Sequence, residues 1–138
     1  KKVFVKDNVS LPSRGEAGIF DLKSKTTNDK FYLDVDRRGR IEFSKFKIQN
    51  RFAGNKLPLV RIDIDSAPHM NPDGSKTSRN NIHIFKEMEN DTGNLPWAYS
   101  LENFEPINFN RDCINFMEIF SGFCEYCNII MNNIQGVI

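Results

Sequence analysis

The stretch of residues 59–87 constrains the fold most, because two segments of alternating polarity flank a turn-rich connection. In the first segment, Val60, Ile62 and Ile64 alternate with ionisable side chains. In the second, Ile82 and Ile84 alternate with polar or aromatic ones. Successive side chains of a strand point to opposite faces, so both segments are predicted strands with an isoleucine-rich core face. The other face would carry Arg61, Asp63, Asp65, His83 and Glu87.

The neighbouring segments predict more strands of an antiparallel sheet. Residues 30–36 alternate clearly, residues 19–23 do so weakly, and residues 97–101 form a short candidate. The sequence from Asp36 to Gly39 predicts a tight hairpin turn and a return strand over residues 40–49. A bulge near Ser44 and Lys45 would explain why the apolar positions of that strand change phase.

The C-terminal third predicts a helix. Asn110 is a plausible N-cap for a helix over residues 111–127, where apolar side chains recur at helical spacing. The apolar tail of residues 129–138 is expected to pair with a sheet edge or a partner, and residues 1–6 resemble the end of a helix. The fold class is therefore α+β: an antiparallel β-sheet of about five strands with a long C-terminal helix packed on one face. Residues 1–138 form a single predicted domain.

The three cysteines favour reduced thiols in a cytoplasmic protein, because their number is odd and no secretion signal precedes them. No apolar run reaches the ~20 residues that cross a bilayer, so no membrane is expected among its partners. Cys124 and Cys127, with His69 and His83, could form a zinc site. We favour roles for these cysteines in the core, because the paired spacings of structural zinc sites are missing.

Charge is distributed unevenly along the chain. Residues 30–61 hold nine Lys or Arg against three acidic residues, whereas residues 87–125 hold eight acidic residues against one Arg. A concentrated basic surface suits a phosphate backbone, although such charges can also simply solvate two outer faces. The predicted nucleic-acid-binding residues are Arg37, Arg38, Arg40, Lys45, Lys47 and Trp97. Tyr99 is an alternative to Trp97 for stacking on a base.

The two histidines suggest a chemistry for the polar face. One imidazole can take the proton of a 2′-hydroxyl while another protonates the leaving oxygen, so His69 and His83 predict metal-independent RNA cleavage. Arg61 would hold the phosphate, and Asp63 would complete the site. Cofactors are expected to be absent. A magnesium-dependent alternative would instead use Asp63, Asp65, Asp73 and Glu87 as ligands.

Several sequence blocks together resemble a family of small bacterial proteins of unknown function, found in Gram-positive bacteria and mobile elements. They are FYLDVDRRGRIEFSKFKIQNR, LVRIDID, PHMNPDG, NIHIFKE, PWAYSL and YCNI, spread between Phe31 and Ile129. The chain differs where an HIHIY block is common, because Phe85 replaces the tyrosine. A tyrosine hydroxyl at that position is therefore not essential here.

The family has no established activity. The resemblance therefore implies only a biological setting, which is conflict between bacteria and mobile DNA. The first hypothesis is a toxin-like endoribonuclease acting on RNA, with an antitoxin as partner. The second is a phage-encoded, non-enzymatic inhibitor of the anti-CRISPR type. It would bind a ribonucleoprotein nuclease or another defence protein, using acidic residues such as Glu87, Glu89 and Asp91 to mimic nucleic acid. The third is a nucleic-acid-binding module without chemistry.

Overall fold

The computed structural model describes residues 1–39, 44–85, 95–131 and 134–135. Within these residues, seven strands form one antiparallel sheet in the order β1-β3-β4-β5-β6-β7-β8. Their bounds are β1 Lys2–Phe4, β3 Ala17–Ser24, β4 Lys30–Asp36, β5 Phe46–Phe52, β6 Pro58–Ile64, β7 Asn81–Ile84 and β8 Ala98–Ser100. A second, small sheet pairs β2 (Val9–Ser10) in parallel with β9 (Ile134–Gln135).

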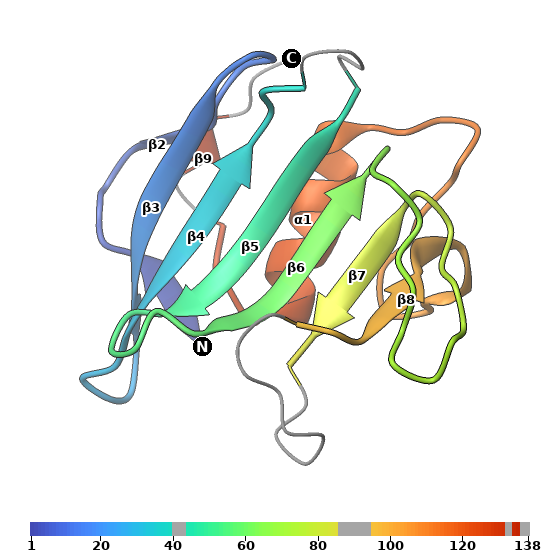
Figure 1. Ribbon diagram of the computed structural model, residues 1–138. Helices are drawn as coiled ribbons and strands as arrows, with labels where there is room; N and C mark the ends of the chain where they lie inside the picture. Colours follow the sequence, from blue (N-terminus) through green and yellow to red (C-terminus); the bar gives the residue numbers. More distant parts are fainter. Residues whose placement is uncertain (40–43, 86–94, 132–133, 136–138) are drawn as a thin grey trace.

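One helix, α1 (Phe116–Tyr126), covers one face of the seven-stranded sheet and lies behind it in Figure 1. The core lies between them, and the ring of Phe46 on β5 meets that of Phe116 at 5.0 Å between centroids. Six of its fully buried side chains are Leu33, Ile48, Ile62, Ile82, Phe120 and Phe123. We call the sheet face opposite α1 the open face. The α+β prediction is therefore confirmed, but the predicted number of about five strands is wrong.

One strand that the sequence did not predict is β1 at the N-terminus, where the sequence resembled the end of a helix. β1 pairs with β3, and its outer side contacts the chain that follows α1. The N–H of Lys2 donates to the carbonyl of Asn128 at 2.8 Å, and the N–H of Ile130 donates to the carbonyl of Lys2 at 2.9 Å. The predicted pairing of the C-terminal tail with a sheet edge is thus confirmed at Ile129 and Ile130. A three-residue strand shows too little periodicity to be identified without these distant partners.

The predicted return strand after β4 is observed at residues 46–49, within β5. β4 ends at Asp36 and β5 begins at Phe46, so residues 37–45 join them. The register irregularity on β5 lies between Asn50 and Arg51 and not near Ser44 and Lys45. Residues 40–43, which prompted the predicted bulge, lie outside the described residues.

The helix begins five residues later than predicted. The Oδ1 of Asn115 accepts a hydrogen bond from the N–H of Glu118 at 3.0 Å, so Asn115 is the N-cap. The predicted cap, Asn110, instead stabilises a turn, because its Oδ1 accepts from the N–H of Asp112 at 3.0 Å. Within the described residues, only η2 (Leu101–Asn103) is a further helix, and no helix there is long and apolar enough to cross a membrane.

Candidate nucleic-acid interface on the open face

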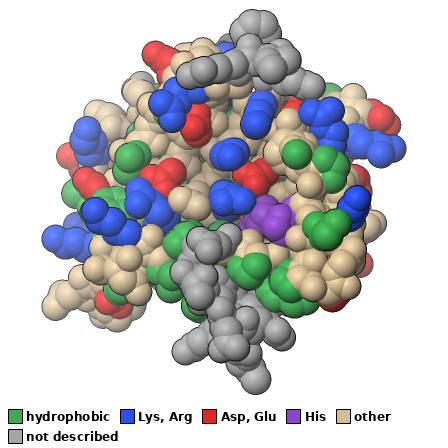
Figure 2. Space-filling model, in the orientation of Figure 1, with side chains coloured by type: hydrophobic (Ala, Val, Ile, Leu, Met, Phe, Trp, Pro, Cys, Tyr) green, Lys and Arg blue, Asp and Glu red, His purple; other side chains and the backbone are tan. Residues whose placement is uncertain are grey.

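The register of the sheet brings the predicted site residues of β6 and β7 together. Arg61 lies directly opposite His83 on β7, and Asp63 lies opposite Asn81. On the other side of β6, Asp63 faces Lys47 of β5. Ile62 and Ile82 face the core, so alternation along each strand turns Arg61, Asp63 and His83 to the open face, as predicted. Figure 2 shows this face, where Lys and Arg side chains are interspersed with acidic ones and the histidines lie near the middle.

Arg61, Asp63 and His83 form one hydrogen-bonded network. The guanidinium of Arg61 contacts the Oδ2 of Asp63 at 3.1 Å, and the Nε2 of His83 lies 3.2 Å from the same oxygen. The Nδ1 of His83 is 2.8 Å from the carbonyl oxygen of Leu95. A carbonyl only accepts, so Nδ1 carries a proton. Nε2 then either accepts from Arg61, which lies 3.3 Å away, or is protonated and donates to Asp63.

The Asp63 carboxylate is held charged although its side chain is buried. Burial by itself would raise the pKa of Asp63, but the hydrogen bond from His83 and the charges of Arg61, His83 and Lys47 outweigh it and lower the pKa. The contacts of Arg61 and His83 with Asp63 are both made to its Oδ2. Among the described residues, the buried Oδ1 of Asp63 and the buried Oδ1 of Asn81 opposite have no hydrogen-bond donor.

His69 reaches the network from the connection between β6 and β7. Asn71 docks this segment on β8: its Nδ2 donates to the carbonyl of Ala98 at 3.0 Å, and its Oδ1 accepts from the N–H of Ala98 at 2.8 Å. The ring of His69 thereby meets that of His83 edge-on, with centroids 4.6 Å apart. The prediction that the two histidines lie together is supported by this contact.

The same contacts limit what the histidine pair can do. The Nε2 of His69 is 2.6 Å from the carbonyl oxygen of Pro96, so both rings are anchored to consecutive backbone carbonyls, at Leu95 and Pro96. His83 is only 2% exposed, whereas His69 is partly exposed. His83 therefore has no free nitrogen for a substrate, and only His69 combines a position beside the network with access to solvent.

The predicted nucleic-acid-binding residues separate into distinct environments. Arg37 is 6% exposed; its guanidinium donates to the carbonyl of Pro12 at 3.0 Å and lies over the ring of Phe116 at 4.1 Å. This places Arg37 in the core on the α1 side, where it cannot contact a phosphate backbone. Arg38 is exposed and forms two side-chain hydrogen bonds with Asp36. Arg40 lies outside the described residues.

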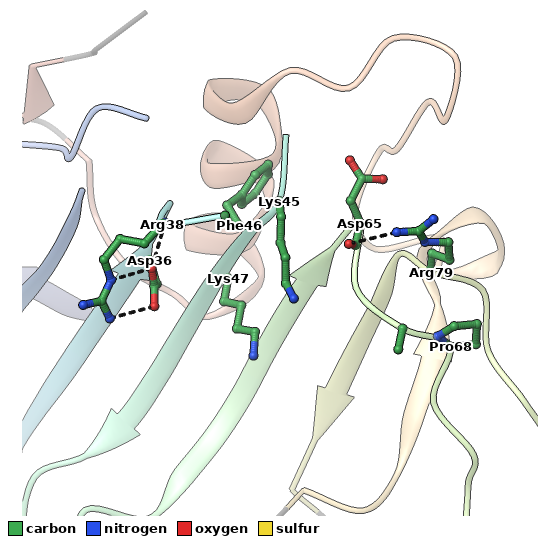
Figure 3. A pocket seen from close by; sticks show the side chains of 10 residues that line it. Asp36, Arg38, Lys45, Phe46, Lys47, Asp65, Pro68 and Arg79 are labelled. Carbon is green, nitrogen blue, oxygen red and sulfur yellow. Dashed lines mark hydrogen bonds and ion pairs between the residues drawn. The ribbon is translucent and has the colours of Figure 1, made fainter. Parts of the chain in front are cut away.

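Lys45 and Lys47 line an open pocket of about 730 Å³ at the end of β4, β5 and β6. Among the described residues, four basic side chains line it against two acidic ones: Arg38, Lys45, Lys47, Arg79, Asp36 and Asp65. Gly39, Phe46, Ala67 and Pro68 complete the described lining. Figure 3 shows the two lysines extending between the Arg38–Asp36 pair and the segment that carries Asp65, Pro68 and Arg79. Neither lysine has an ion pair within the described residues, whereas Arg38, Arg51 and Arg61 each contact a carboxylate.

The contacts of Tyr99 and Trp97, the two aromatic candidates, differ. Tyr99 lies opposite Ile82 and stacks on Phe104, which contacts Tyr126 of α1. These contacts place Tyr99 on the α1 side of the sheet, away from the open face. Trp97 is partly buried just before β8, and the N–H of Ile84 donates to its carbonyl at 3.3 Å.

The proposed metal sets are not assembled in the described part of the chain. Asp73 caps a local turn through Ser75, and its Oδ1 lies 2.6 Å from the Ser75 hydroxyl. Glu87 is outside the described residues, and among those described no three His, Cys, Asp or Glu side chains could hold a metal ion. Cys124 and Cys127 are buried in the core, so they lie across the sheet from the histidines. Burial raises the pKa of Cys127 to about 12, consistent with a protonated core thiol.

Sequence reasoning missed Arg79 and Pro68 as members of the pocket. Neither follows from strand periodicity, because both belong to the connection between β6 and β7. Arg79 is held by the carbonyls of Ser66 and Asp65, at 3.2 and 3.4 Å. Arg79 and Asp65, fourteen residues apart, are thus brought to one edge of the pocket. The turn residues within this connection were the only available signal.

The fold and the site define a class of α+β protein: a seven-stranded antiparallel sheet with one helix-covered face and one open face bearing a polar network beside a basic pocket. The chain belongs to a family of unknown function, DUF6978, whose model matches residues 1–129. The predicted resemblance to a family of unknown function is thereby confirmed. No curated protein and no solved structure matches the chain.

Proposed function

We propose that the protein binds single-stranded RNA along the open face, with the phosphate backbone passing through the basic pocket. The observation that carries the proposal is the pair Lys45 and Lys47, which line the pocket and form no ion pair within the described residues. Phosphate contacts of this kind supply most of the sequence-independent affinity for nucleic acid. The setting of conflict between bacteria and mobile elements remains part of this proposal.

The neighbouring arginines Arg51 and Arg61 are already paired with carboxylates, so they contribute less than the lysines to the attraction of phosphate. Arg51 donates to the Oδ1 of Asp34 at 2.8 Å, and Arg61 contacts Asp63. These ion pairs restrain both guanidinium groups on aspartates of the sheet. Their charges are largely compensated, and we therefore assign the electrostatic attraction chiefly to the lysines.

Replacing both lysines by alanine tests the proposal. The K45A/K47A variant should bind a fluorescein-labelled single-stranded RNA at least about tenfold more weakly at low salt. The slope of log K against log salt concentration should decrease by about 1 to 1.5, since each lost contact on a single strand removes roughly 0.7 of slope. Fluorescence anisotropy at several salt concentrations measures both quantities.

The matched control is K23A/K30A, which removes an exposed cross-strand lysine pair from another part of the same face. It lowers the net charge equally but should leave most of the affinity intact. Equal losses in both double variants would contradict a localised site. If the wild-type protein binds no RNA even at low salt, the protein-inhibitor hypothesis takes precedence.

A second candidate function is RNA cleavage, favoured by the position of His69 beside the network of Arg61, Asp63 and His83. The burial of His83 changes the roles expected from the sequence. His69 becomes the single imidazole able to exchange a proton with a substrate. The guanidinium of Arg61, whose side chain is 28% exposed, is the group able to contact a phosphate, while His83 positions Asp63 and the loop at Leu95.

A further inference from the structure

Asp65 is an unexpected member of a pocket that attracts phosphate. It directly follows β6 and has a φ of 54°, in the left-handed region that few residues other than glycine, asparagine and aspartate adopt. The Oδ1 of the buried Asn80 accepts a hydrogen bond from the N–H of Asp65 at 3.0 Å. Arg79 donates to the Asp65 carbonyl. Two neighbours therefore fix the backbone of Asp65 where this residue lines the pocket.

The two carboxylates of the pocket are not equivalent. Asp36 is neutralised by Arg38, whose side chain donates to both of its oxygens at 3.1 and 3.0 Å. The hydrogen bonds recorded for Asp65 involve only its backbone, and no hydrogen bond or ion pair to its carboxylate is found within the described residues. Its negative charge would weaken the binding of a bare phosphate. A ligand that combines a phosphate with a nearby hydroxyl donor would instead use both the lysines and Asp65.

We infer that the pocket holds one ribonucleotide unit of a bound RNA strand, with its phosphate on Lys45 and Lys47 and its 2′-hydroxyl donating to the carboxylate of Asp65. This inference rests on the proposed RNA binding and adds a specificity-determining residue to it. A 2′-hydroxyl is the group that distinguishes RNA from DNA at a single site. The apolar surface of Ala67 and Pro68 lines the same pocket and provides a contact for the ribose or base. A volume of about 730 Å³ is within the range of small-ligand sites.

The test compares three labelled strands of one sequence: RNA, DNA and 2′-O-methyl RNA. The methylated strand keeps the phosphates but cannot donate from the 2′ position. The wild-type protein should bind RNA about tenfold more tightly than either of the others, the order expected for one hydrogen bond to a charged acceptor. Equal affinity for RNA and DNA in the wild type would overturn the role of Asp65 while leaving the proposed RNA binding intact.

Two variants of Asp65 separate recognition from folding. Asp65→Gly suits the positive φ and removes the carboxylate, whereas Asp65→Asn retains a residue that tolerates this backbone and removes only the charge. Both should reduce the preference for RNA, with Asp65→Gly abolishing it. DNA affinity should stay equal or increase, because a negative charge near the phosphate is gone. Parallel losses for RNA and DNA would overturn the assignment, since they indicate damage to the whole pocket.

Two further measurements complete the test. K45A/K47A should weaken RNA and DNA alike, whereas unchanged affinity for both would refute the proposed interface itself. A free ribonucleoside 5′-monophosphate should compete much less well than an RNA strand at the same nucleotide concentration, because neighbouring phosphates also contribute in the strand. Equal competition would overturn the assignment to a polymer and favour a free nucleotide as the ligand.

Discussion

Replacing His83 by alanine should lower the free energy of unfolding by about 3 kcal/mol, the magnitude typical of removing one member of a buried hydrogen-bonded network. The change removes the donor to the Leu95 carbonyl and one of the two groups that contact the Oδ2 of Asp63. It also leaves a cavity in place of the His83 side chain, which is 2% exposed. Urea denaturation should show the loss as a lower midpoint at an unchanged slope.

The loss should depend on pH in a defined direction. The folded-state pKa of Asp63 is lowered, so its stabilising contribution is fully present above the unfolded pKa of ~3.9 and is lost as pH falls through the lower folded pKa. Removing His83 withdraws a cause of that lowering. The difference in stability between the wild type and His83→Ala should therefore shrink in strong acid. The control is Arg38→Ala, which breaks an exposed ion pair and should cost less than ~1 kcal/mol.

A destabilisation by His83→Ala as small as that of Arg38→Ala would contradict the network described here. A difference that grew in acid would contradict the charged state assigned to Asp63. Either result would indicate that the open face is an ordinary solvated surface. The positions of Arg61 and His69 would then give no support to a function.

For RNA cleavage, His69→Gln should lower the rate by at least ~10²-fold, the usual contribution of a general acid or base. Glutamine can still donate to the Pro96 carbonyl, which the Nε2 of His69 contacts at 2.6 Å, so stability should change by less than ~1 kcal/mol. The wild-type rate should survive EDTA. Measurement of both a rate and an unfolding curve distinguishes a proton-transfer role from a structural one.

Two outcomes would reject this mechanism. Activity lost in EDTA and restored by Mg²⁺ would transfer the chemistry to carboxylates such as Asp63 and Asp65. RNA that stays uncut by the purified wild-type protein would remove cleavage and leave the binding proposal to stand alone.

The alternation of β6 and β7 was sufficient to place Arg61, Asp63 and His83 on one face, because strand geometry dictates the side of every residue. Elements that depend on distant partners were not predictable in this way. β1 exists through its pairing with β3 and the contacts of Lys2 beyond α1. The start of α1 required a choice between two asparagines, and both of them accept local backbone hydrogen bonds.

The residues of the functional surface were also only partly predictable, because their burial depends on contacts between distant segments. Lys45 and Lys47 stood out by charge, but the sequence offered no way to distinguish Arg37, which is buried under Phe116, from Arg38, which is exposed. The burial of His83 depends on the backbone at Leu95 and on the docking of Asn71 against Ala98. These contacts join segments separated by at least twelve residues, beyond the reach of local periodicity.

The central claim is that the open face, and not the α1 side, contacts RNA. Photo-crosslinking of a single-stranded RNA carrying 4-thiouridine, followed by mass spectrometry of the linked peptides, tests it most directly. We expect crosslinks in the peptides that contain Lys45 and Lys47 and in those that contain residues 65–69. Crosslinks confined to peptides of α1 or of residues 101–109 would contradict the account.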